Sequence, residues 1–74
     1  MIMEKLLEII NYVRENKGLD PLAEIKASDD LRKDLGFSSF DLAELTVRIE
    51  AEYDVDIFED GVVVTVGDIL KKLK

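Results

Sequence analysis

Apolar residues recur at spacings of three and four in three segments of this chain, and this periodicity constrains the fold more than any other feature. The segments are residues 3–15, residues 39–53 and the residues that follow Thr65. Their apolar positions are Met3, Leu6, Leu7, Ile10 and Val13, then Leu42, Leu45, Ile49 and Tyr53, then Val66, Ile69, Leu70 and Leu73. Such spacing places the apolar side chains on one stripe of an α-helix. The pattern predicts three helices that bury these stripes against one another.

We therefore predict an all-α fold, a small bundle of three main helices in a single domain over residues 1–74. A core of this size gives a net stability of only about 3–5 kcal/mol without disulfides or metals. The side chains expected in the core are Leu6, Ile10, Leu45, Ile49, Tyr53, Ile69 and Leu73.

The first connection carries turn signals. Gly18 suits the end of the first helix, and Pro21 disfavours helical backbone at Asp20. We therefore predict a loop up to Ala27, after which Ser28 caps a short helical piece over residues 29–35.

The second connection contains the run of residues 62–66, which has strong β propensity. A lone five-residue strand is not stable without partner strands. We therefore expect extended backbone pinned by valines, with at most one helical turn. Thr65 and Asp68 have the spacing of a capping box, which predicts the start of the last helix, and the lysines near its end (Lys71, Lys72 and Lys74) complement the helix dipole.

The composition narrows the function classes. The chain has no cysteine and no histidine, so it lacks the thiolates and imidazoles that most often bind metals or act as general bases. We expect no enzyme activity and no metal site. The first residues lack the features of a signal peptide, and no apolar run approaches the roughly 20 residues of a membrane span. We therefore expect a cytoplasmic protein that does not insert into membranes.

The charge is concentrated in the middle of the chain. Residues 34–60 carry nine acidic residues and one basic residue, a net charge of −8, whereas residues 1–33 carry −1 and residues 61–74 carry +2. An acidic centre repels nucleic acid and anionic membranes and steers basic protein partners toward it. The plain alternative is a solvated acidic surface that maintains solubility. We expect a monomer that binds no nucleic acid.

Two serines precede the acidic helix. Ser38 suits the N-cap, because its hydroxyl can accept from a free backbone N–H, and Asp41 three residues later completes a capping box. Ser39 then falls in the first turn, where free N–H groups and the positive end of the helix dipole favour a phosphate on its oxygen. A capping serine needs no chemistry, so this pattern alone leaves both interpretations open.

The run Asp34-Leu35-Gly36-Phe37-Ser38-Ser39-Phe40, followed by Glu44-Leu45, resembles the signature of acyl carrier proteins. The resemblance extends through the acidic helix to the segment Thr65-Val66-Gly67-Asp68-Ile69. It implies an acyl-carrier-like bundle whose helix before the last is short or degenerate here. It also implies that Ser39 carries 4′-phosphopantetheine, transferred from coenzyme A, as the arm that holds acyl groups as thioesters in fatty-acid, polyketide or related lipid biosynthesis.

The same resemblance implies a set of contact residues. A phosphopantetheinyl transferase and acyl-transferring or acyl-modifying enzymes would use basic patches to bind the helix at Asp41, Glu44, Val47, Arg48 and Glu50. Ile57, Val62 and Val64 would line a pocket for the acyl chain, although core packing explains the same residues.

Some positions differ from the family pattern, and one acidic run suggests a different function. Ser38 stands where the family usually has aspartate, and Arg48 where the family residue is usually small. A carrier of aminoacyl or peptidyl groups, or an acidic helical interaction module without an arm, remain alternatives. The run Asp54-x-Asp56 with Glu59 and Asp60 does not match a calcium loop, because the fifth and sixth positions are Phe58 and Glu59.

Overall fold

The computed structural model describes residues 2–59 and 61–73, so Lys74 and Asp60 lie outside the described residues. Three helices make up the regular structure of the described part: α1 (Ile2–Asn16), α2 (Ser39–Tyr53) and α3 (Val66–Lys72). In these residues the extended backbone forms one isolated bridge and no strand. The predicted all-α fold with three main helices is confirmed. None of the three helices is long and apolar enough to span a membrane.

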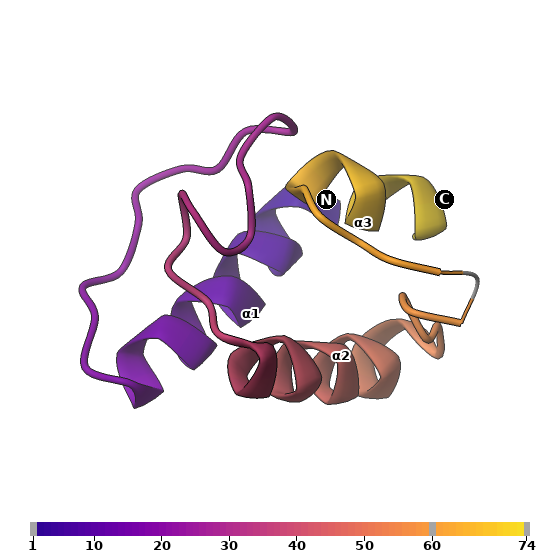
Figure 1. The fold of residues 1–74 in the computed structure, drawn as a ribbon, viewed down its shortest axis with the longest axis horizontal. Helices are drawn as coiled ribbons and strands as arrows, with labels where there is room; N and C mark the ends of the chain where they lie inside the picture. The colour runs from indigo at the N-terminus through magenta and orange to yellow at the C-terminus, as the bar shows by residue number, and fades with distance from the viewer. Residues whose placement is uncertain (1, 60, 74) are drawn as a thin grey trace.

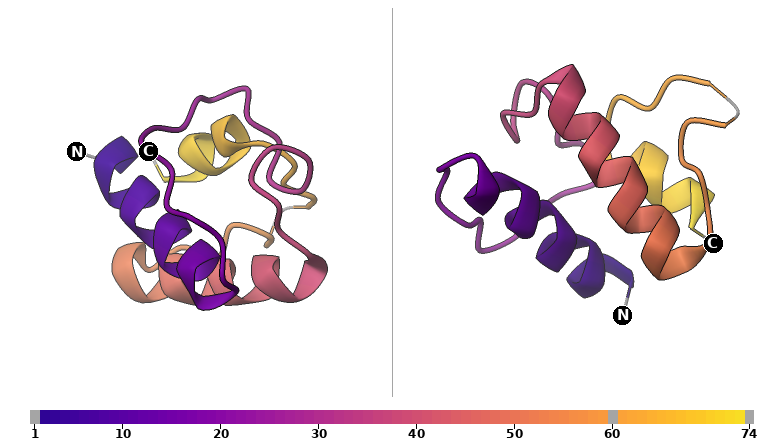
Figure 2. Two further views of the ribbon diagram at one scale, coloured as in Figure 1. Left: turned by 90° about the vertical axis from the view of Figure 1, so that its left-hand side faces the viewer. Right: turned by 90° about the horizontal axis from the view of Figure 1, so that it is seen from below.

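Helices α1 and α2 pack side by side, and α3 lies over one face of this pair (Figures 1 and 2). Their apolar stripes meet in one hydrophobic cluster, as the periodicity requires. Five of the predicted core residues are buried: Leu6, Ile10, Leu45, Ile49 and Ile69. Tyr53 and Leu73 are half-buried and pack against the edge of the cluster. The predicted apolar stripes therefore do face the core, but the core also includes residues outside the three helices.

Much of the remaining core comes from the long connection between α1 and α2, which curves along the left of Figure 1. Four apolar side chains of this connection are buried: Ile25, Leu31, Leu35 and Phe37. Helix α1 also anchors the backbone of the connection. The Arg14 guanidinium donates to the carbonyl of Leu35 (2.5 Å), and the Asn11 side chain exchanges two hydrogen bonds with the backbone of Leu22 (2.7 and 2.9 Å). This long loop is therefore a packed part of the structure.

The prediction of a short helix over residues 29–35 is wrong. Residues 31–35 form a turn, in which the N–H groups of Asp34 and Leu35 both donate to the carbonyl of Asp30. The cap is also different, because the carboxylate of Asp30, rather than Ser28, accepts the N–H groups of Arg32 and Lys33.

The physical reason is a pairing between distant segments. The N–H of Leu31 donates to the carbonyl of Val64 (2.9 Å), and the N–H of Val66 donates to the carbonyl of Asp29 (3.0 Å). These bonds hold the backbone at Asp29 to Leu31 extended, so a helix cannot begin there. The same bonds give hydrogen-bond partners to the carbonyl of Val64 and the N–H of Val66, so this valine-rich segment needs no sheet for them.

In the described residues between α2 and α3, one turn forms at residues 57–59, and residues 62–64 lie outside any helix or strand. Asp54 ends α2 in the left-handed conformation (φ 58°), and its N–H caps the carbonyl of Glu50. The helix that we expected to be short or degenerate is thus reduced to a turn. At the other end of this segment, Thr65 and Asp68 form the predicted capping box of α3.

Candidate functional site

Ser38 is the N-cap of α2 and forms the predicted capping box with Asp41. Its backbone is extended (φ −89°, ψ 176°), and its hydroxyl accepts from the N–H of Asp41 (3.3 Å). The Asp41 carboxylate in turn accepts from the N–H and the hydroxyl of Ser38 (2.8 and 2.9 Å). The hydroxyl of Ser38 is therefore used within the cap.

Ser39 is the first residue of α2, and its hydroxyl plays no part in this cap. The side chain is exposed, and its oxygen accepts a hydrogen bond from the Arg32 guanidinium (Nη2 to Oγ, 2.8 Å). The first N–H groups of a helix have no partners within it and carry the positive end of its dipole. Ser39 thus presents an accessible hydroxyl in positive surroundings, which suits an attached anionic group.

Besides the predicted cap, Asp41 has a second structural role that the sequence analysis did not predict. Its carboxylate, in a residue that is only 6% exposed, forms an ion pair with Lys17 (2.5 Å), which also donates to the carbonyl of Gly36 (2.8 Å). These bonds connect the end of α1 to the start of α2. We predicted Asp41 as a partner contact, but its carboxylate is committed to the cap and to Lys17, so we leave it out of the docking surface.

These bonds also determine how Asp41 titrates. The Lys17 ammonium, and then the N–H of Ser38, hold the pKa of Asp41 below its ordinary value. A carboxylate with a lowered pKa stabilises the fold above its unfolded pKa of about 3.9, and this contribution is lost as the pH falls through the folded pKa.

We therefore expect Asp41→Asn to lower the thermal midpoint at pH 7 and to flatten its decline below about pH 4, where the native protein loses this contribution. Midpoints measured by circular dichroism from pH 7 to pH 2 test this. Some decline persists in the variant, because backbone N–H groups also lower the pKa of Asp30 and Asp68. Equal slopes in the two proteins below pH 4 would contradict the assignment.

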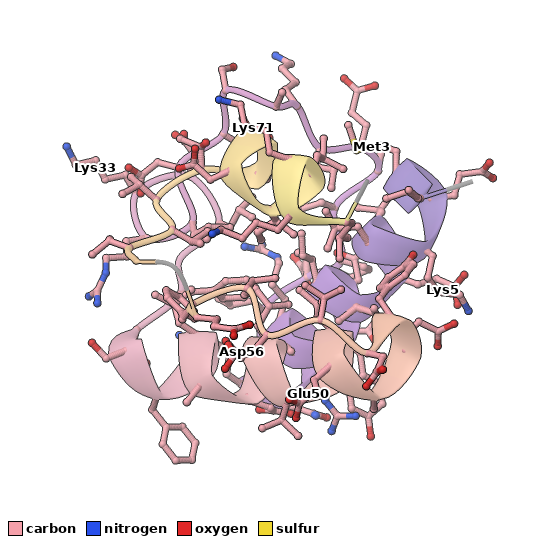
Figure 3. All side chains as sticks on the ribbon, turned by 90° about the vertical axis from the view of Figure 1, so that its right-hand side faces the viewer. Met3, Lys5, Lys33, Glu50, Asp56 and Lys71 are labelled. Atoms are coloured by element: carbon pink, nitrogen blue, oxygen red, sulfur yellow. The ribbon has the colours of Figure 1, made fainter. Side chains whose placement is uncertain are left out.

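The remaining predicted partner contacts lie on the outer part of α2. Val47 is 64% exposed, and Glu50 is exposed and points away from the ribbon of α3 (Figure 3). Glu44 is half-buried and accepts from Arg48 (3.0 Å) and from Asn16 (3.4 Å). Because Glu44 is neutralised by its own neighbour, Glu50 offers the freer carboxylate.

Arg48 has a second contact, since its guanidinium lies 3.9 Å from the centroid of the Tyr12 ring. This cation–π contact joins α2 to α1. Arg48 is thus both a predicted partner contact and part of the packing between the two helices.

The predicted acyl-pocket residues divide into two groups. Ile57 is fully buried in the core, whereas Val62 and Val64 are 85% and 48% exposed. Both valines line a mostly apolar pocket of about 170 Å³. The other residues that line it are Asp30, Leu31, Arg32, Lys33, Leu42, Phe58 and Val63.

A second, open hollow lies at Ser39, and it shares three residues with the apolar pocket: Arg32, Leu42 and Phe58. The two hollows are therefore adjacent, so a group attached to Ser39 could reach the pocket. Sequence reasoning missed Arg32 and Phe58 as site residues. Both lie in turns, where no periodicity indicates which side chains converge.

Within residues 2–59 and 61–73, no cluster of three or more acidic side chains could hold a metal ion. The rejected calcium pattern includes Asp60, which lies outside these residues.

Comparisons with known proteins show the family of this chain. The family model described as a phosphopantetheine attachment site matches residues 7–71. An acyl carrier protein of Clostridium acetobutylicum is 33% identical over 76 residues, covering 100% of this chain and 94% of the relative. Acyl carrier proteins of Trieres chinensis and Phaeodactylum tricornutum are each 34% identical, covering 89% and 86% of this chain and 84% and 86% of the relatives. No solved structure matches the chain.

The matched region covers most of the chain, and the family is one of non-catalytic carriers. The chain belongs to the acyl carrier protein family, whose domain has a phosphopantetheine attachment site. The family implies 4′-phosphopantetheine as the prosthetic group. The residues present fit this group, because the Ser39 hydroxyl is exposed, is not used by the cap and lies beside the Arg32 guanidinium.

Proposed function

We propose that the protein is an acyl carrier for fatty-acid, polyketide or related lipid biosynthesis, and that Ser39 is its attachment site. The observation that carries the proposal is the contrast between the two serines. The Ser38 hydroxyl is held in the cap, whereas the Ser39 hydroxyl is exposed at the positive end of α2. Phosphopantetheine attached there would provide the terminal thiol that this cysteine-free chain lacks.

The apolar pocket beside Ser39 favours acyl cargo over aminoacyl or peptidyl cargo. It is lined by Val62, Val63 and Val64 together with Leu31, Leu42 and Phe58. Burying apolar surface is favourable by about 25 cal/mol per Å², whereas burying an unpaired amine is costly. The pocket therefore suits a hydrocarbon chain.

Intact-mass analysis tests the proposal directly. The protein is incubated with coenzyme A, magnesium and a phosphopantetheinyl transferase, and we expect the mass of one arm to be added and to map to Ser39. The arm is then loaded with a saturated acyl chain or with an aminoacyl group of matched length. The acyl form should have the higher thermal midpoint, because a group that binds the folded state stabilises it. If the protein gained no mass, the proposed carrier function would be contradicted. If the acyl and aminoacyl forms had equal thermal midpoints, the assignment of acyl cargo would be contradicted.

We propose that partner enzymes with basic patches dock on the outer part of α2, at Glu44, Val47, Arg48 and Glu50. Support comes from the −8 charge of residues 34–60 and from the exposure of Val47 and Glu50. An exposed apolar residue among carboxylates is a common interface pattern, in which charge guides the encounter and apolar contact holds it.

Charge reversal tests this docking face. We expect Glu50→Lys to slow association with the transferase more than Glu4→Lys, which changes the net charge equally from an exposed position on α1. The difference should shrink with salt, since the Debye length falls from about 10 Å at 0.1 M to about 3 Å at 1 M. Association rates by stopped flow measure it. Equal rates for the two variants, or a difference that salt does not change, would remove α2 as the docking face.

A further inference from the structure

Arg32 makes a contact that neither its position in the sequence nor the capping of α2 explains. Its guanidinium donates to the oxygen of Ser39 (2.8 Å), seven residues away. No carboxylate of residues 2–59 and 61–73 forms an ion pair with it. A guanidinium has five N–H donors arranged for bidentate binding of oxyanions, and one hydroxyl uses only one of them.

The backbone that carries Arg32 is held in place. The Asp30 carboxylate accepts the N–H groups of Arg32 and Lys33 (2.8 and 2.9 Å). Leu31 is fully buried and pairs with the backbone of Val64. The turn is thus anchored to the core immediately before Arg32, so the guanidinium reaches Ser39 from a fixed base.

We propose that Arg32 binds the phosphate of the arm on Ser39 and directs the arm toward the apolar pocket. This inference rests on the proposed attachment at Ser39. A phosphodiester on the Ser39 oxygen places anionic oxygens on the phosphorus bonded to that oxygen, within reach of the unused guanidinium donors. Charge-assisted bonds of this kind are stronger than a bond to a neutral hydroxyl.

The direction of the arm follows from what surrounds the guanidinium. Arg32 lines both the hollow at Ser39 and the apolar pocket, together with Leu42 and Phe58. A phosphate held by Arg32 would therefore lie at the point where the two hollows meet. From there the arm can pass over Leu42 and Phe58 to the valines, where its cargo is shielded from water.

Lys26 is a control in the same connection between α1 and α2. It has the same charge and is also exposed, but it lines neither the hollow at Ser39 nor the apolar pocket. Removing the charge of Lys26 thus changes the net charge as much as removing that of Arg32, without removing a contact at Ser39.

The experiment compares wild-type protein with Arg32→Gln, Arg32→Lys and Lys26→Gln, each without and with the arm. Intact mass first confirms that the arm is present on each. The readouts are the ³¹P chemical shift of the arm and the difference in thermal midpoint between the two forms of each protein.

We expect Arg32→Gln to move the ³¹P signal and to reduce the stabilisation by the arm by roughly 2–8 °C, with less effect at 1 M salt. Arg32→Lys should lie between wild type and Arg32→Gln, and Lys26→Gln should match wild type. If the arm is present but Arg32→Gln and Lys26→Gln behave alike, Arg32 does not hold the phosphate. If wild-type protein gains no arm, the proposed function itself fails, which is a separate result.

Discussion

Ser39→Ala should abolish the mass gain that coenzyme A and a phosphopantetheinyl transferase produce on the wild-type protein. The substitution removes the proposed acceptor oxygen and its exposed hydrogen bond from Arg32, but the side chain contributes nothing to the cap of α2. Alanine is also the best helix former, so the variant should keep its circular dichroism spectrum and most of its thermal stability. Intact-mass spectra of both proteins under identical conditions measure the loss.

Ser38→Ala is the matched control for this result. It removes the N-cap hydroxyl and the bond from Ser38 to the Asp41 carboxylate, which should destabilise the protein by about 0.5–2 kcal/mol. It should still accept one arm. We thus expect Ser38→Ala to lower stability without preventing modification, and Ser39→Ala to prevent modification without lowering stability much. An arm that maps to Ser38, or a mass gain on Ser39→Ala, would reverse the assignment.

Phe37→Ala should unfold much of the protein, whereas Phe40→Ala should leave the fold intact. The two phenylalanines are three residues apart on either side of the serines, but Phe37 is 3% exposed and Phe40 is 80% exposed. Truncating a buried phenylalanine costs about 3–5 kcal/mol, which matches the whole stability of about 3–5 kcal/mol expected for a domain of this size. Truncating an exposed side chain changes stability by about 0.5 kcal/mol or less.

Urea denaturation followed by circular dichroism distinguishes the two variants. We expect Phe37→Ala to lack a folded baseline at 25 °C and Phe40→Ala to keep the midpoint of the wild type. A well-folded Phe37→Ala would mean that the connection between α1 and α2 packs less tightly than its burial indicates. Since Phe40 contributes little to the fold, any slowing of arm transfer in Phe40→Ala reports on contact with the transferase.

Local signals in the sequence were sufficient to predict the three helices and the N-caps of α2 and α3. Both capping boxes, at Ser38 with Asp41 and at Thr65 with Asp68, form as the spacing predicts. These features depend on residues within one or two turns of each other, so they can be inferred without knowing the path of the chain. The candidate attachment serine belongs to the same group, because its position relative to the cap is local.

The tertiary structure decided the backbone conformation and the long-range contacts of the segments that connect the helices. The pairing of residues 29–31 with residues 64–66 prevented the predicted helix over 29–35. The ion pair of Asp41 with Lys17 joins residues 24 positions apart, and it connects the residue after α1 to the first turn of α2.

The surroundings of Ser39 depend on the same long-range contacts. The turn that carries Arg32 is held by the backbone of Val64, and Val64 also lines the apolar pocket. Such contacts form only when distant segments are brought together by burial of side chains such as Leu31 and Phe37. The sequence by itself therefore determined that Ser38 caps α2 and that Ser39 follows it in the first turn, because helix capping is local. Only the packed structure determined that an arginine and an apolar pocket lie beside Ser39, because their positions depend on the path of the whole chain.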